Sequence, residues 1–211
     1  MSYQAISATT ATLLALLEEN FAADPLFAGF FAAGGGGGNR VVSPRTPREM
    51  EQAQDTGLSV WLYQIARDPE LLNRPRERIA ADSLSRRPLP LRLHYLLTPV
   101  VQETEAGDND PGMEQLIIGK VLQIFHDHPK LSGVQLRGSL IGTGTSVRVR
   151  LEPLDLEEIT RVWDALESSY QLCVSYEVSV VMVASDSESA RTAPVDAVEP
   201  EHGVIRAVQS A

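Results

Sequence analysis

The sequence predicts an α+β fold: a single domain in which a largely antiparallel sheet packs against about three helices, followed by a C-terminal arm. Two long stretches alternate apolar and polar residues with the period of a strand, and three others repeat apolar residues at helical spacing. Their order along the chain is helix, strands, helix, hairpin, helix, strand. We therefore expect a domain over residues 1–184 and an arm over residues 185–211.

The first expected helix covers residues 7–21, where apolar side chains recur at helical spacing and Ser7 or Thr9 can cap the N-terminus. Residues 34–57 are expected to form a flexible glycine-rich loop and a connection, because five consecutive glycines occupy positions 34–38. A phosphate-binding loop is not favoured, because no Lys-Ser/Thr pair follows the glycines and no helix is expected to open after them.

Two strands are expected next. Residues 58–66 are apolar on both faces, which is typical of a strand buried within a sheet. Residues 88–100 alternate instead, with leucines and a tyrosine on one face and Arg92 and His94 on the other. The second strand should therefore have one buried face and one less apolar face.

Two further helices are indicated in the second half of the chain. Residues 113–127 carry a broad apolar face, and Pro129 disfavours helical geometry just beyond them. The other helix starts after Asp155, which can form an acidic version of the capping box with Glu158. The buried stripe of this last helix is expected to consist of Leu156, Ile159, Val162, Trp163 and Leu166.

Three more strands complete the expected sheet. Residues 134–141 and 147–151 are expected to form a hairpin around the turn sequence GTGTS. Residues 170–183 alternate over a length that would exceed about 40 Å, against about 17–20 Å for a usual strand. We expect this last strand to bend or to project beyond its own domain.

Composition argues against several classes of function. The chain has 18 Lys and Arg against 28 Asp and Glu, a formal charge of −10, which opposes sequence-independent binding of nucleic acid. No apolar stretch has the length of a membrane span, and the first basic residue is Arg40, which is not the pattern of a signal peptide. The single cysteine, Cys173, cannot form an internal disulfide or a CxxC zinc site.

The histidines do not form an obvious catalytic or metal site. His126 and His128 are two residues apart near the end of a helix, so they point in different directions and cannot share one ion. The sequence contains no GxSxG motif that would supply a nucleophile for His94. A small hydrolase that uses His94 with Ser146 or Cys173 remains an alternative. We predict no catalytic residue, no cofactor and no metal. The simpler interpretation is a polar sheet face that carries Arg92, His94, Arg148, Arg150 and Glu177.

Four segments resemble the cap, or tail-terminator, proteins of extracellular contractile injection systems such as the Photorhabdus virulence cassettes and the antifeeding prophages. They are LSVWLYQI, PLPLRLHYLLTP, IIGKVLQIFHDHP and the stretch from RVRLEPLDLEEITRVW to YEVSVVMV. The resemblance covers roughly residues 58–183 and makes residues 1–184 a cap domain. The glycine run and the acidic arm depart from the family pattern.

The resemblance implies a structural role without catalysis. It implies a homo-oligomeric ring, a hexamer, that closes the end of the inner tube and anchors the last layer of sheath, with assembly in the cytoplasm as part of a particle that is retained or released. The expected partners are other copies of the chain, the sheath protein and the inner tube protein, with no nucleic acid and no direct insertion into a membrane. The alternatives are a small hydrolase using His94 and a monomeric acidic adaptor.

A ring subunit needs surfaces that meet its neighbours, and strand addition is one way to provide them. The arm is acidic and contains Pro194 and Pro200, so it cannot bury enough apolar surface to fold alone. Its last residues resume a short apolar pattern, and the strand over residues 147–151 carries two arginines. The expected oligomer or partner interface consists of Val204, Ile205, Val208, Arg148 and Arg150.

Overall fold

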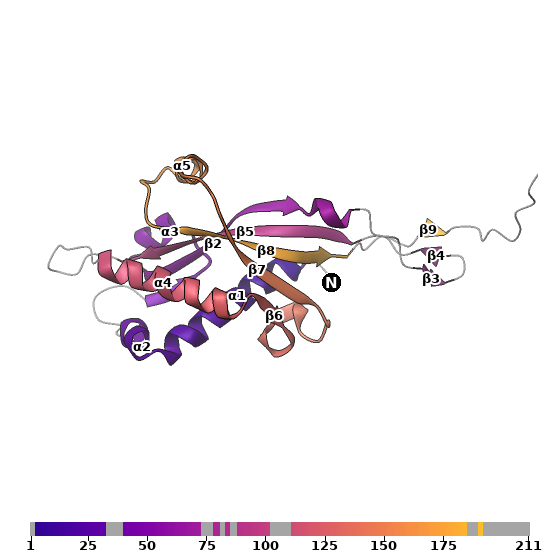
Figure 1. The fold of residues 1–211 in the computed structure, drawn as a ribbon, viewed down its shortest axis with the longest axis horizontal. Coiled ribbons are helices and arrows are strands. Elements are labelled where there is room, and N and C mark those ends of the chain that lie inside the picture. Colours follow the sequence, from indigo (N-terminus) through magenta and orange to yellow (C-terminus); the bar gives the residue numbers. More distant parts are fainter. Residues whose placement is uncertain are drawn as a thin grey trace, which may run out of the picture.

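The centre of the molecule is a six-stranded sheet, in a computed structural model that describes residues 3–32, 40–72, 78–80, 83–84, 88–101, 111–184 and 190–191 (Figure 1). Across the sheet the strands are β1 (Arg40–Ser43), β2 (Thr56–Arg67), β5 (Leu89–Val100), β8 (Val174–Val183), β7 (Ser146–Glu152) and β6 (Lys130–Ser132). Only the β1–β2 pair is parallel, and the other four pairs are antiparallel. The predicted α+β class with a largely antiparallel sheet is confirmed.

Helices cover the two faces of this sheet unequally. On one face lie α1 (Ala5–Ala23), α2 (Pro25–Ala32) and α4 (Pro111–Asp127), which share one apolar core with the strands. On the other face α5 (Leu156–Ala165) packs over one end of the sheet through a separate, smaller core (Figure 1). The short helices α2 and α3 (Pro47–Gln52) add to the three that the sequence predicts.

β5 lies in the middle of the sheet and is buried on both faces. Leu93, Tyr95 and Leu97 belong to the large core with α1 and α4, and the Tyr95 hydroxyl lies 2.8 Å from the Thr10 hydroxyl of α1. Leu96 points the other way and packs with Trp163 of α5 and Cys173. The alternation read from the sequence therefore corresponds to two cores, one on each side of the strand.

The region predicted as loop and connection contains two ordered elements. β1 and α3 lie within residues 34–57, and Thr46 and Glu49 form the capping box of α3. β1 can pair with β2 because Gly57 has no side chain: a Cβ there would lie 2.1 Å from the Val41 carbonyl oxygen. The glycine run at positions 34–38, for which flexibility is predicted, lies outside the described residues.

The predicted strand over residues 134–141 is wrong. This segment contains two 3₁₀ turns, η2 (Gly133–Gln135) and η3 (Gly138–Leu140), and the hairpin partner of β7 is β6. Gly133 and Gly138 adopt positive φ values of 59° and 57°, which turn the chain away from an extended path. The turns bury Leu136 and Leu140 in the large core, so apolar spacing here serves packing against α1.

Two details near α5 also differ from the prediction. β8 starts at Val174, not at residue 170, because the chain between α5 and β8 first places Cys173 under Trp163. Leu156, expected in the buried stripe of α5, is exposed, whereas Ile159, Val162 and Leu166 pack against the small core as expected. The Asp155 and Glu158 capping box is confirmed, with a bond of 2.8 Å from the Glu158 N–H to the Asp155 carboxylate.

A separate small sheet joins β3 (Arg78–Ala80), β4 (Ser83–Leu84) and β9 (Ala190–Arg191). β9 lies within residues 185–211, the segment predicted as an arm, and pairs with β4 in antiparallel fashion. Residues 190–191 therefore pair with a segment that lies between β2 and β5 in the sequence. Residues 192–211, with Val204, Ile205 and Val208, lie outside the described residues.

We predict that Trp163→Ala lowers the free energy of unfolding by about 3–5 kcal/mol, the usual effect of truncating a buried tryptophan. Trp163 is 1% exposed and is the largest side chain of the small core. Urea unfolding monitored by circular dichroism measures the change.

Leu156→Ala, in the same helix but 68% exposed, is the matched control and should change the free energy by less than about 0.5 kcal/mol. Equal stabilities of the two variants would contradict the assignment of Trp163 to the core.

Candidate functional site

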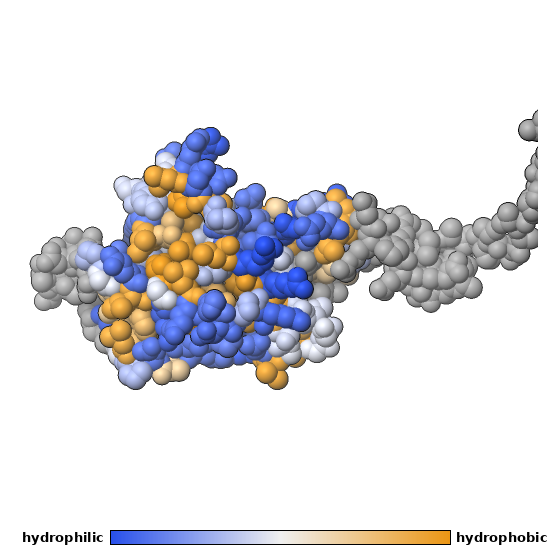
Figure 2. All heavy atoms as spheres, viewed as in Figure 1, coloured by the Kyte–Doolittle hydropathy of each residue, from blue (hydrophilic) through white to orange (hydrophobic). Residues whose placement is uncertain are grey.

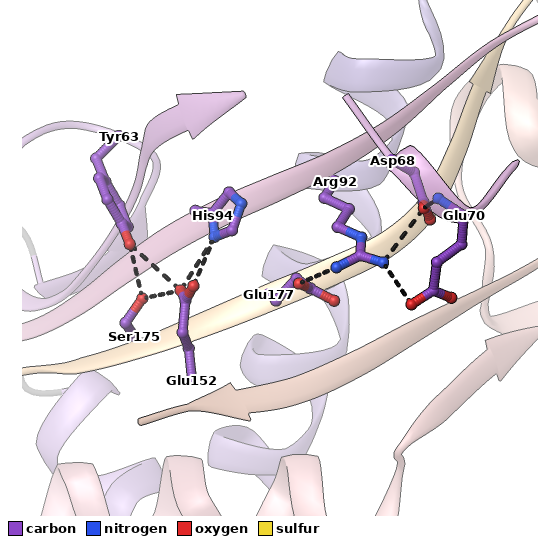
Figure 3. Close-up of polar contacts among 8 residues, drawn as sticks. All are labelled: Tyr63, Asp68, Glu70, Arg92, His94, Glu152, Ser175 and Glu177. Carbon is purple, nitrogen blue, oxygen red and sulfur yellow. Dashed lines mark hydrogen bonds and ion pairs between the residues drawn. The ribbon is translucent and has the colours of Figure 1, made fainter. Parts of the chain in front are cut away.

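The sheet face that α5 leaves open carries rows of polar side chains. Strand register places His94 of β5 opposite Glu177 of β8, and Glu177 opposite Arg150 of β7. The next row towards α5 places Ser175 between Leu96 and Glu152. This is the polar face that the sequence predicts, and two hydrogen-bonded clusters organise it (Figure 3).

The first cluster is centred on the Glu152 carboxylate. The Nδ1 atom of His94 lies 3.0 Å from both Glu152 oxygens, and the Ser175 hydroxyl donates to Oε2 at 2.8 Å. The Tyr63 hydroxyl lies 3.1 Å from the Ser175 hydroxyl and donates to Glu152 Oε2 at 3.3 Å (Figure 3). Burial raises the pKa of Tyr63 to about 12, so its phenol stays protonated at neutral pH and serves as a donor.

This order of side chains does not match a nucleophilic triad. A Ser-His-Asp triad places the histidine between the hydroxyl and the carboxylate, so that the ring can take the hydroxyl proton. Here the Glu152 carboxylate lies between Ser175 and His94. His94 is also only 8% exposed, which leaves little room for a substrate at its ring. The geometry fits a structural hydrogen-bond cluster that holds β2, β5, β7 and β8 together.

The second cluster gathers three carboxylates around Arg92. Its guanidinium lies 3.2 Å from Asp68, 3.4 Å from Glu70 and 3.5 Å from Glu177 (Figure 3). The hydrogen bond with Asp68 is the main cause that raises the pKa of Arg92, and the three negative charges add to it. Asp68 also caps the 3₁₀ turn η1 (Pro69–Leu71) through the Glu70 N–H at 2.9 Å. The cluster therefore fixes the end of β2 against β5 and β8.

The residues proposed for a hydrolase do not come together. Ser146 is at the start of β7, where it pairs with Ser132 of β6. Arg150, which lies in the same row as His94, is four residues or about 13 Å further along the strand. The Cys173 sulfur accepts a hydrogen bond of 3.5 Å from the Trp163 indole inside the small core. Burial raises the pKa of the Cys173 thiol, which disfavours the reactive thiolate.

The described residues contain no group of three or more His, Cys, Asp and Glu side chains arranged to hold a metal ion. His126 is exposed near the end of α4.

Arg148 and Arg150, predicted for an interface, are exposed on the open face of β7.

On the opposite face of the sheet, a groove of about 510 Å³ runs between α4 and the end of β7. Figure 2 shows an apolar area on the visible side between α4 and α5. The groove is lined by Leu122, Gln123, Phe125, His126, Pro129, Val149, Leu151 and Tyr176.

The model of one protein family, the Pvc16 N-terminal domain, matches residues 8–197. The chain belongs to this family. The match begins within α1 and covers all six strands of the main sheet, so this Pvc16 N-terminal domain includes both polar clusters and the groove. The resemblance seen in the sequence is thereby confirmed.

Two solved structures are similar to the domain. The anti-feeding prophage tube-terminating cap gives a TM-score of 0.50 at 20% identity, over 72% of this chain and 51% of that one. The sheath/tube terminator of an extracellular contractile injection system, in its extended state, gives 0.46 at 20% identity, over 73% and 52%. The chain thus spans about half the length of these structures. None of the curated proteins compared matches it.

Within the described part of this Pvc16 N-terminal domain, no helix is long and apolar enough to cross a membrane.

Sequence reasoning finds part of the polar face and misses the rest. Glu152 and Ser175 occupy polar positions of alternating strands, so register alone would have added them to the predicted set. Tyr63 and Asp68 gave no such signal, because β2 is apolar on both faces and an irregularity between Leu62 and Gln64 shifts its register.

Proposed function

We propose that this protein is a structural cap that terminates the tube of a contractile injection system. The observation that carries the proposal is membership of the Pvc16 N-terminal domain family over most of the chain. The fold shared with the anti-feeding prophage tube-terminating cap supports it. The arrangement of Ser175, Glu152 and His94 supports a role without catalysis, since the histidine is not placed to activate the hydroxyl.

We propose the following oligomeric state, domain boundaries and partners for this cap. The cap is a homo-oligomeric ring, a hexamer, with residues 1–184 as the cap domain and residues 185–211 as an arm. Its partners are the sheath protein and the inner tube protein, and it assembles in the cytoplasm as part of the particle. A ring is supported by an open sheet edge and an arginine-bearing face that are available to neighbours. The monomeric adaptor is the competing function, and light scattering of the purified chain separates it from a ring.

Assembly of particles with and without this protein tests the cap role. Tubes assembled with their sheath but without the protein should have irregular lengths and open ends by negative-stain electron microscopy, and adding the protein should restore closed ends. His94→Ala protein should restore closed ends as well, because we assign His94 to a structural cluster with Glu152 and not to any chemical step. Restoration by wild type and failure by a folded His94→Ala variant would contradict the non-catalytic role.

The interface is proposed to include Val204, Ile205 and Val208 of the arm together with Arg148 and Arg150. An arm with a short apolar end can order on the sheet edge of a neighbour, where main-chain hydrogen bonds offset its loss of entropy. The described residues of the core domain form two apolar clusters of their own.

We predict that protein lacking residues 192–211 keeps the circular dichroism spectrum and melting temperature of a folded domain but fails to close tubes in the same assembly assay. Normal closed ends with the truncated protein would exclude the arm from the interface. The loss of the folded spectrum on truncation would show that these residues belong to the domain.

A further inference from the structure

The outer edge of β7 is only partly covered by β6. The ladder between the two strands pairs residues 146–148 of β7 with residues 130–132. One residue further on, the Val149 N–H donates to the Pro129 carbonyl at 2.9 Å. Proline has no N–H, so Pro129 cannot donate back to Val149, and the ladder ends there. Because backbone groups alternate in direction along a strand, the N–H and C=O of Leu151 point to the same open side as those of Val149.

An apolar groove lies directly beside this open edge. It has a volume of about 510 Å³, and Val149, Leu151 and Phe125 are among the residues that line it. The Leu151 side chain itself is 56% exposed, although it shares a row with the buried Tyr176. A strand added beside Leu151 would point every second side chain into this groove, so those side chains should be apolar.

At the same edge, the other face of the sheet, away from the groove, is basic. Lys130 of β6 lies directly opposite Arg148 of β7, with Arg150 two residues along, and all three are exposed. None of them forms an ion pair with any residue that the structure describes, since Glu152 and Glu177 lie against His94 and Arg92. Like charges directly opposite each other destabilise a sheet, so this arrangement costs stability in the isolated chain. An anionic neighbour on this side would reverse that cost.

We propose that the open edge of β7 binds, by strand addition, an extended segment of a neighbouring subunit in which apolar and acidic side chains alternate. The apolar side chains enter the groove beside α4, the acidic ones meet Lys130, Arg148 and Arg150, and the backbone bonds to Leu151. The identity of the neighbour as part of the assembly rests on the proposed cap function. The binding itself does not, so it is tested on the isolated full-length protein.

Fluorescence anisotropy with two labelled, end-capped peptides of about eight residues tests the proposal. One alternates valine with glutamate and the other alternates valine with lysine. The wild-type protein should bind the glutamate peptide at least about tenfold more tightly, the effect of several cross-strand charge pairs together. The double variant Arg148→Glu/Arg150→Glu should reverse this preference, and both proteins should keep the same circular dichroism spectrum.

Two further variants separate strand addition from charge attraction alone. Leu151→Pro removes the outward N–H while leaving the ladder to β8 intact, and Leu151→Asp places a charge at the groove; each should abolish saturable binding. Ile141→Asp, at a similarly exposed apolar residue that does not line the groove, is the matched control and should bind as wild type.

Three results would overturn the proposal. They are equal affinity of the wild-type protein for both peptides, unchanged binding by the folded Leu151 variants, and tighter binding of a single-stranded oligothymidylate than of the glutamate peptide. If the protein binds the glutamate peptide but does not close tubes, the cap role is rejected and strand addition stands. If the protein closes tubes but does not bind the peptide, strand addition is rejected and the cap role stands. A fourth result would also overturn it. If the full-length protein does not bind the glutamate peptide but protein lacking residues 192–211 does, the chain's own arm occupies the edge in place of a segment from a neighbouring subunit.

Discussion

The burial of β5 on both faces is the constraint on which the rest of the structure depends. Leu93, Tyr95 and Leu97 need apolar partners on one side and Leu96 needs them on the other, so a single layer of helices cannot satisfy the strand. α1 and α4 supply the first side and α5 the second. The path of the chain after β7, out to α5 and back into β8 under Trp163, follows from this requirement.

α5 is too short to cover its whole face of the sheet, and this explains the polar side chains beyond it. Where apolar cover ends, buried donors and acceptors must pair with one another. His94 and Arg92 do so with Glu152, Glu177 and Asp68, which connect β5 with β7, β8 and the residue that follows β2. Among the described residues, only the Nε atom of Arg92 and one carboxylate oxygen of Glu177 in these clusters are buried without a partner. Clusters of this kind resemble active sites in composition, but their geometry here is that of cross-strand support. Open backbone positions lie at the edge of β7 beyond β6 and at the edge of β2 beyond β1, and both can interact with other chains.

The long periodic segments were predictable from the sequence, and the short or non-periodic ones were not. β5, α4 and α5 follow from spacing because one face of each is buried against a continuous core. α2 is apolar nearly all round, so its sequence showed no stripe, and β1 depends on the close approach that Gly57 allows from a distant position. The site was harder still, since His94 and Glu152 are 58 residues apart and meet only through the register of three strands. The predicted burial of Leu156 was wrong, because the apolar stripe of α5 begins at this residue but contact with the small core begins at Ile159.

Native-state hydrogen exchange, resolved by residue, tests the central role of β5 most directly. If both cores close on this strand, the amides of residues 93–97 should exchange only through global unfolding and be among the slowest in the chain. The amides of α5 should exchange faster, through local opening of the smaller core, and the outward amide of Leu151 faster still. Amides of residues 93–97 that exchange as fast as those of α5 would contradict the account, because the strand would then open together with the element that it is said to hold in place.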